Sequence, residues 1–235
     1  MRRRKARFIW VYPLAVWLFA IARTTERSLR LGAAVILLGE VLRLWANGYV
    51  GHLKVNRSQP GRPETRMGRL ITGGPYAFVR NPLYAGSFLI VMGFCVAMTS
   101  PVAAAAALVC FAMLYGEKTK REEELIHGEW GAEYAAYLAA VPRWVPTWRR
   151  YPHRHGRWTW QGIMASKELK TVVWVIVGLL AVYVREEVLQ EREWWAPAAR
   201  AKQTTVLAAA AVLVAIDGLL ELTGWLGRRK AQARG

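Results

Sequence analysis

Long apolar runs alternate with polar, basic stretches along this chain, and this alternation indicates the fold class. Runs near the length that crosses a bilayer, about 20 residues, occupy residues 8–22, 29–50, 83–99, 102–116, 169–184 and 204–226. Only Ser100-Pro101 separates the third run from the fourth, so we expect a tight helical hairpin in which Pro101 opens the second helix. The pattern predicts an all-α, polytopic integral membrane bundle of about six spans, one pair of which is this hairpin.

Composition narrows the function classes. The chain has 235 residues, of which 54% are hydrophobic, and a formal net charge of +17. Such a charge also suits nucleic-acid binding, but here the basic residues are spread over several loops between apolar runs, so we expect no nucleic-acid partner. The only two cysteines, Cys95 and Cys110, lie inside apolar runs, and the four histidines share no metal-ligand spacing. We therefore predict neither a disulfide framework nor a metal site.

The charges of the loops predict the topology. Residues 51–82 contain six Lys or Arg and one Glu, 6 − 1 = +5, whereas residues 185–201 contain three Arg and four Glu, 3 − 4 = −1. By the positive-inside rule, both termini and the basic loops are expected in the cytoplasm and the acidic loop outside. Residues 23–30, the first external turn, carry 3 − 1 = +2 and go against this assignment. In a bacterium the membrane would be the inner one.

Three regions differ in composition. We expect N-terminal spans in residues 1–50, a core with polar loops and the hairpin in residues 51–150, and a Trp-containing basic linker with an accessory two-helix hairpin in residues 151–235. The last region shows no catalytic motif, so it would shield a lipid-facing entrance or form a homo-oligomer contact. Within the apolar runs, Glu40 and Arg43 are spaced as an intramembrane pair, and Asp217 is expected to make a structural hydrogen bond.

The densest polar signal lies in residues 73–86, which read GGPYAFVRNPLYAG. The Gly-Gly-Pro start permits an unusual turn, and Asn81-Pro82 predicts a helix that begins with a capping residue and a proline. Tyr76, Arg80 and Tyr84 would then converge on one helix N-terminus, where anions and polar ligands bind readily.

This stretch resembles the Gly-x-Tyr-x-x-x-Arg-His-Pro-x-Tyr-x-Gly signature of the isoprenylcysteine carboxyl methyltransferase family, which includes phospholipid N-methyltransferase relatives. A second block resembles the family downstream. It comprises Glu122-Glu123, then Trp130-Gly131-x-x-Tyr134-x-x-Tyr137, and then Val141-Pro142-Arg143 and Pro146. The resemblance covers residues 29–146, about half of the chain.

The resemblance implies S-adenosylmethionine as the cofactor, held in a pocket on the cytoplasmic side. Position by position, it implies cofactor contacts from Gly68, Arg69, Leu70, Ile71, Tyr76, Asn81, Pro82, Leu83, Tyr84, Glu122 and Glu123. It implies catalytic roles for Arg80, Asn81 and Arg143, and a substrate contact from Lys118.

Two positions depart from the family pattern. Asn81 stands where the family usually has His, and Asn cannot titrate near neutral pH, so it cannot act as a general base. Lys118 stands where an Arg is expected and cannot offer a carboxylate the bidentate fork of a guanidinium. Either the nucleophile needs no base, as with a thiolate or carboxylate, or another group supplies one.

The expected activity is methyl transfer to a lipophilic or membrane-embedded acceptor, which enters from the bilayer among membrane lipids. An isoprenylcysteine-type carboxylate, a phospholipid amine and a small thiol all stay open as acceptors. Methyl transfer from a sulfonium requires mainly alignment and exclusion of water, and tyrosine faces and carboxylates suit a cationic cofactor. The alternative is a non-enzymatic membrane scaffold or transporter that retains a degenerate methyltransferase fold.

Overall fold

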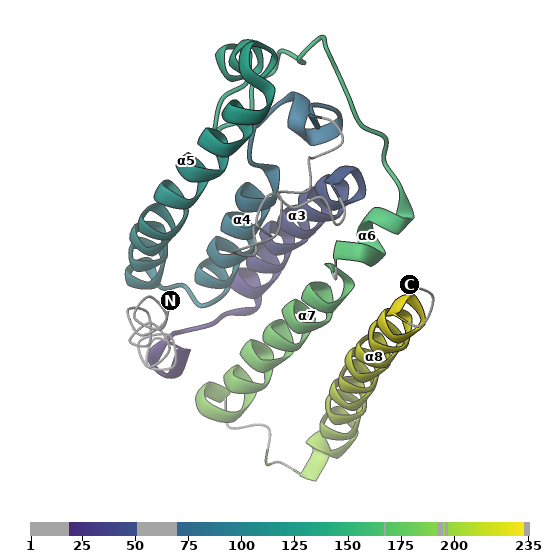
Figure 1. The fold of residues 1–235 in the computed structure, drawn as a ribbon. Coiled ribbons are helices and arrows are strands. Elements are labelled where there is room, and N and C mark those ends of the chain that lie inside the picture. Colours follow the sequence, from purple (N-terminus) through teal and green to yellow (C-terminus); the bar gives the residue numbers. More distant parts are fainter. Residues whose placement is uncertain (1–18, 51–69, 167, 192–194, 196, 233–235) are drawn as a thin grey trace, which may run out of the picture. The chain divides into compact units, whose positions relative to one another are not determined.

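The computed structural model describes residues 19–50, 70–166, 168–191, 195 and 197–232. Within these residues the regular elements are helical and no strand occurs, which confirms the predicted all-α class. In chain order they are α3 (Glu26–Val50), η2 (Gly74–Ala77), α4 (Pro82–Ala97), α5 (Pro101–Ala140), α6 (Trp160–Ser166), α7 (Glu168–Arg185), η3 (Glu186–Glu191), η5 (Pro197–Ala199) and α8 (Arg200–Gln232) (Figure 1). Most of the predicted span 8–22 lies outside the described residues, as do Gly68 and Arg69.

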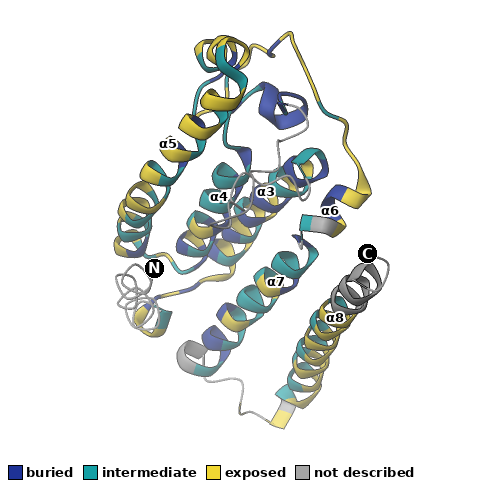
Figure 2. Cartoon of the chain, in the orientation of Figure 1, coloured by how far each residue is buried: buried dark blue, intermediate teal, exposed yellow. Residues whose placement is uncertain are grey.

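Two of the described helices are long and apolar enough to cross a membrane. These are α5, whose apolar part precedes a charged second half, and α8, in which the apolar window within Arg200–Leu222 has none of its residues buried. Figure 2 shows α8 with exposed and intermediate residues along its described length. The helix α4 is apolar but has only 16 residues. The predicted spans 29–50 and 169–184 coincide with α3 and α7, and the six-span topology stays a prediction.

The predicted hairpin is present between α4 and α5. Pro101 occupies the first turn of α5, and the Ser100 hydroxyl accepts a hydrogen bond from the Ala103 amide at 3.1 Å. Together these residues cap α5 in the manner that the sequence indicates, because the serine side chain satisfies one amide that has no partner within the helix.

Glycines bring α3 and α4 into close contact. A Cβ atom built on Gly39 would lie 2.7 Å from the Gly86 carbonyl oxygen, and one built on Gly86 would lie 2.7 Å from the Gly39 carbonyl oxygen. About two turns away, toward the end of α4 and the start of α3, a Cβ on Gly93 would meet the Gly32 carbonyl oxygen at 2.7 Å. Backbones at this separation leave no room for side chains, as at small-residue interfaces between membrane helices. The contact fixes the start of α4 against α3.

The chain divides into two compact units. One comprises residues 1–29, 97–99 and 169–235, and the other comprises residues 30–96 and 100–168. In the first unit Lys170 of α7 forms ion pairs with Asp217 and Glu221 of α8, at 3.5 and 2.7 Å, which joins the two helices of the predicted accessory hairpin. The second unit contains all described residues of the predicted site.

Candidate functional site

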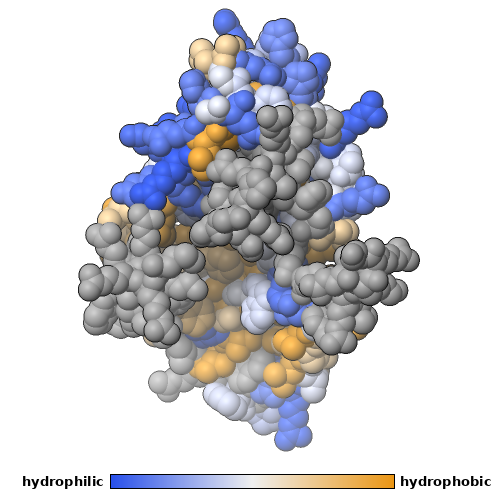
Figure 3. Space-filling model, in the orientation of Figure 1, coloured by the Kyte–Doolittle hydropathy of each residue, from blue (hydrophilic) through white to orange (hydrophobic). Residues whose placement is uncertain are grey.

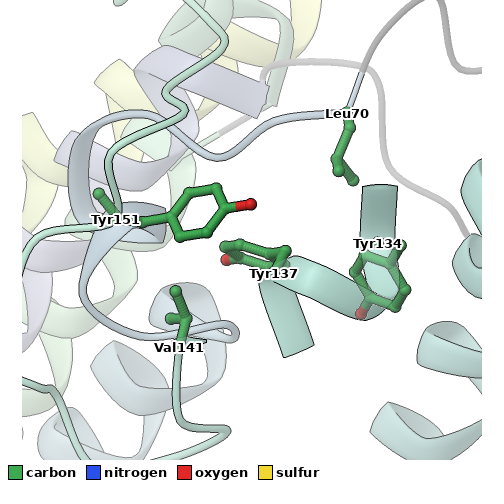
Figure 4. Close-up of a cluster of buried hydrophobic side chains, with 6 residues drawn as sticks. Leu70, Tyr134, Tyr137, Val141 and Tyr151 are labelled. Atoms are coloured by element: carbon green, nitrogen blue, oxygen red, sulfur yellow. The ribbon is translucent and has the colours of Figure 1, made fainter. Parts of the chain in front are cut away.

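The site rests on a cluster of buried side chains from three segments. Its members are Leu70, Ala77, Tyr134, Tyr137, Val141 and Tyr151. In Figure 4 the ring of Tyr137 lies between those of Tyr134 and Tyr151, and the Tyr137 and Tyr151 rings meet edge to face with centroids 5.2 Å apart. The break in α5 at Gly131, which has a φ of 48°, directly precedes the turn of the helix that carries Tyr134 and Tyr137. The predicted Trp-Gly-x-x-Tyr-x-x-Tyr block is therefore a kinked helix that carries the core of the site.

The Gly-Pro-Tyr turn is built on this cluster. Gly74 has a φ of 60°, and a Cβ atom there would lie 2.3 Å from a carbon of the Tyr49 ring, so only glycine fits. Tyr76 is buried, and its carbonyl oxygen accepts a hydrogen bond from the Tyr137 hydroxyl at 2.7 Å. Burial raises the pKa of the Tyr76 phenol well above its ordinary value, so this tyrosine stays neutral.

Glu123 binds both arginines that the resemblance made catalytic. Arg143 donates to the two carboxylate oxygens of Glu123 at 3.1 and 2.5 Å, and Arg80 lies 3.2 Å from one of them. The hydrogen bond and charge of Glu123 raise the pKa of Arg143 further. The carboxylate is thereby shared between two cations, which fixes Arg80 and Arg143 side by side.

Asn81 contacts the same carboxylate. Its amide nitrogen lies 3.5 Å from Glu123 and 3.4 Å from the carbonyl oxygen of Arg143. The backbone reinforces this junction, because the Arg80 amide donates to the Pro142 carbonyl at 2.9 Å. The residue that replaces the family's histidine thus joins the start of α4 to the Val-Pro-Arg element.

Glu122, the neighbouring acid, has a different environment. The Tyr84 hydroxyl lies 2.9 Å from both of its carboxylate oxygens. Glu122 lies beyond the apolar part of α5, and burial raises its pKa, while the Tyr84 hydrogen bond and the charge of Lys118 act in the opposite direction. The Lys118 ammonium lies over the Tyr84 ring, 4.9 Å from its centroid, and 5.8 Å from that of Tyr115. The structure brings Tyr84, Lys118 and Glu122 together.

An aromatic row extends from this group along α4 and α5. The Tyr84 and Tyr115 centroids are 4.8 Å apart, and Phe111 follows at 4.5 Å from Tyr115. Phe88 and Trp144 complete the row, at 4.9 and 5.6 Å from Phe111. Sequence reasoning missed these neighbours. The signal was available, because positions 111, 115, 118 and 122 fall on one helical face.

The expected pairing of Glu40 with Arg43 is wrong. Arg43 instead makes a bidentate ion pair with Glu168, with its Nε at 2.5 Å and its Nη2 at 3.0 Å from the carboxylate oxygens. Asn47 donates to the same carboxylate at 2.7 Å. Glu40 is buried, and neither of its carboxylate oxygens has a hydrogen-bond partner among the described residues. Spacing along one helix could not reveal Glu168, which lies 125 positions later and can meet both arms of the guanidinium.

The remaining predicted cofactor residues make contacts that support the fold. Leu70 belongs to the buried cluster, and the Ile71 side chain lies beside Gly156. Pro82 is fully buried at the first turn of α4, and the Leu83 carbonyl accepts a hydrogen bond from Arg43 at 3.3 Å. Across the described part of the chain, no group of three or more potential metal ligands is found.

Known proteins are similar to this chain over the segment that contains most of the site. Residues 28–133 match the phospholipid methyltransferase family. Protein-S-isoprenylcysteine O-methyltransferase B of Arabidopsis thaliana is 30% identical over 115 residues, which are 49% of this chain and 57% of the plant protein. Protein-S-isoprenylcysteine O-methyltransferase of Homo sapiens is 30% identical over 116 residues, 49% of this chain and 40% of the human protein. The core of this chain is therefore similar to phospholipid and isoprenylcysteine methyltransferases.

A third relative extends the similarity beyond the core. The cobalt-zinc-cadmium resistance protein CzcN of Cupriavidus metallidurans is 29% identical over 184 residues, 75% of this chain and 77% of that protein. The chain spans about half the length of the methyltransferases it matches. The match to the family ends at residue 133, before Arg143 and the linker that follows it.

Proposed function

We propose that this protein transfers a methyl group from S-adenosylmethionine to a lipophilic acceptor in the membrane. The observation that carries the proposal is the contact between Tyr84 and Glu122 at 2.9 Å, which joins the two family motifs across 38 sequence positions. Tyr76, the third of these predicted cofactor contacts, lies in the turn before α4 and is fixed there by the hydrogen bond from the Tyr137 hydroxyl to its carbonyl oxygen.

The side chains at this place fit the chemistry of the cofactor. S-adenosylmethionine supplies a methyl group on a sulfonium cation and carries an ammonium and two ribose hydroxyls. Glu122 offers a partly buried carboxylate that can accept hydrogen bonds from an ammonium or a hydroxyl. The Tyr84 ring already has the Lys118 ammonium over its face, so this ring accommodates a cation.

The work left to the chain is alignment and exclusion of water. Glu123 does not share in cofactor binding under this proposal, since both of its oxygens are occupied by Arg80 and Arg143. Glu123 instead fixes the turn before α4 to the Val-Pro-Arg element. This contact keeps Tyr84 and Glu122 in a fixed position relative to each other. Pre-organisation of this kind is what an in-line displacement with a good leaving group demands.

The acceptor we favour is a carboxylate on a lipid-like chain. Asn81 cannot remove a proton near neutral pH, and a carboxylate nucleophile needs no base. Lys118 provides a positive charge beside Tyr84 and Tyr115. The aromatic row that begins there follows the apolar part of α5 and offers an apolar wall to a hydrocarbon chain.

The proposal places the site at a membrane surface. Lys118 and Glu122 follow directly after the apolar part of α5, so a span made by that part would bring them to its end. We infer that this end is cytoplasmic, that membrane lipids surround α5 and α8, and that α7 and α8 serve as the accessory hairpin of a six-span protein. A cysteine-accessibility map of the loops tests the orientation.

Calorimetric titration of the detergent-purified protein with S-adenosylhomocysteine tests the cofactor site. We expect binding that Glu122→Gln and Tyr84→Phe each weaken at least tenfold, because each removes one partner of a charge-assisted contact. Glu124→Gln is the matched control, since Glu124 is an exposed acid in the same run. Equal binding by all three variants, or no binding by the folded protein, contradicts the proposal.

Transfer of a labelled methyl group then distinguishes the enzyme from a scaffold that retains the fold. Asn81 is the residue that favours the scaffold, because it replaces a titratable side chain with a neutral one. An enzyme labels a prenylated cysteine analogue with a free carboxyl and leaves the corresponding ester unlabelled. A scaffold labels neither, whatever its affinity for the cofactor.

A further inference from the structure

The connection between α5 and α6 (residues 141–159) has an unusual composition for a surface loop. It contains five arginines, three tryptophans and no acidic residue. One arginine, Arg143, is used by Glu123 in the site. The other four side chains are exposed and form no ion pair with a described residue. They are Arg149, Arg150, Arg154 and Arg157.

The backbone of this connection is fixed in place. Thr147 and Tyr151 donate from their amides to the carbonyl oxygens of Phe78 and Ala77, at 2.9 and 3.0 Å. Further along, the His155 carbonyl accepts hydrogen bonds from the amides of Thr72 and Gly73, at 3.1 and 2.9 Å. The connection is therefore a fixed platform along the turn that leads into α4, and its backbone loses little further freedom when its side chains bind a partner.

The exposed side chains alternate aromatic with cationic character. Trp148 is fully exposed and directly precedes Arg149-Arg150, while Val145 and Trp160 are also exposed. Figure 2 shows exposed residues along much of this connection, and Figure 3 shows hydrophilic side chains gathered around the end of α5. An indole ring exposed to water does not stabilise a loop, whereas a bilayer interface accommodates indole rings at the level of the headgroups.

We propose that the α5–α6 connection is a docking surface for the phosphate headgroups of anionic phospholipids. Guanidinium groups match phosphate oxygens in geometry and charge, and anionic leaflets attract basic segments next to membrane spans. A nucleobase can stack on the Trp148 indole but offers Val145 no apolar partner, whereas a bilayer interface accommodates both, so the combination with four unpaired arginines favours a lipid. The inference is independent of methyl transfer, because none of the four arginines belongs to the predicted site.

Photo-crosslinking of the full chain in lipid nanodiscs tests the surface. The probes are phosphatidylglycerol and phosphatidylcholine, each with a photoreactive group next to the headgroup, and labelled peptides are mapped by mass spectrometry. Phosphatidylglycerol is expected to label residues 141–159 more than phosphatidylcholine does, by about fivefold for each participating arginine. Labelling by the anionic lipid is expected to fall as salt is raised, because salt screens exposed charges.

Two sets of substitutions make the test specific. The first replaces the four unpaired arginines with glutamine and is expected to reduce anionic labelling to the neutral level. The second is a matched control at exposed basic residues elsewhere and is expected to leave labelling of residues 141–159 unchanged. It comprises Arg23→Gln, Arg27→Gln, Lys120→Gln and Arg200→Gln.

Three outcomes overturn the proposal. One is equal labelling by the two lipids, and another is an equal loss of labelling in both sets of variants. The third is protection of the connection by single-stranded RNA with no dependence on lipid charge, which would make it a nucleic-acid surface. If the fourfold variant does not fold, the pair Arg149→Gln/Arg150→Gln is measured instead, with an expected loss of at least fivefold.

Discussion

Removal of the charge on Glu123 is expected to destabilise the fold, because that charge holds two arginines. The side chains of Glu123 and Arg80 are only 10% and 15% exposed, whereas that of Arg143 is 37% exposed. Breaking a buried ion pair costs about 3–5 kcal/mol, since an uncompensated charge remains, while a half-exposed partner adds at most about 1 kcal/mol. Glu123→Gln keeps the shape and one acceptor oxygen, so we expect a loss near the low end, about 3 kcal/mol.

Thermal unfolding in detergent measures this loss. For a chain of this size about 3 kcal/mol corresponds to a midpoint lower by about 6–12 °C. Glu124→Gln, at an exposed position next to it, is expected to shift the midpoint by less than about 2 °C. The double variant Glu123→Gln/Arg143→Gln is expected to cost less than the sum of the two single changes, because it removes one of the stranded charges. A midpoint for Glu123→Gln equal to that of Glu124→Gln would refute the reasoning.

Three further predictions concern neighbouring features. Because burial raises the pKa of Glu122, affinity for S-adenosylhomocysteine is expected to fall at a higher pH than it would with a glutamate of ordinary pKa. Calorimetry of Glu122→Gln should show no such fall. Gly39→Ala forces a Cβ against the Gly86 carbonyl and is expected to lower the unfolding midpoint, whereas Gly128→Ala, with open space around it, should raise it slightly. Arg43→Lys loses the bidentate contact with Glu168 and is expected to lower the free energy of unfolding by about 2–4 kcal/mol, measured as a lower melting temperature by circular dichroism.

The pH dependence has a definite sign. A carboxylate that accepts an ammonium must be ionised, so binding is strong above the pKa of Glu122 and is lost as pH falls through it. In the free protein the raised pKa favours the neutral form, which means that Glu122 contributes to stability at low pH and loses that contribution as pH rises. Affinity and free-protein stability therefore change in opposite directions across the same pH range, and a pH-independent Kd would count against a role for Glu122.

Local sequence patterns predicted the helical elements well because helix boundaries are local properties. Ser100-Pro101 marked the start of α5 through capping and proline geometry, and the proline of Asn81-Pro82 marked the start of α4, so a few residues determine each start. The family motif added what local rules cannot give, namely that Tyr84 and Glu122 meet. The contact between these two residues depends on the α4–α5 hairpin, whose loop length the sequence does reveal.

Long-range polar pairing was the part that sequence reasoning could not supply. Arg43 had an acid three positions away in Glu40, yet it pairs with Glu168. A guanidinium gains more from a carboxylate that can meet both of its arms than from one on the same helix face. Which distant acid reaches that geometry depends on how α6 and the start of α7 return to α3, and no local spacing encodes this return. Glu168 carries no motif, so nothing marked it in advance.

The two adjacent acids of α5 divide the requirements of the proposed methyl-transfer site between them. Glu123 is occupied by Arg80, Arg143 and Asn81, so its charge is compensated and its position is fixed. Glu122, one residue earlier, accepts a hydrogen bond from the Tyr84 hydroxyl and is partly desolvated, which raises its pKa. A site that must receive a cation needs a carboxylate that is held in place, as the Tyr84 hydroxyl holds Glu122. Because neighbours on a helix project about 100° apart, one helical turn can present both kinds of acid, and the Glu-Glu pair has a physical reason to occur together.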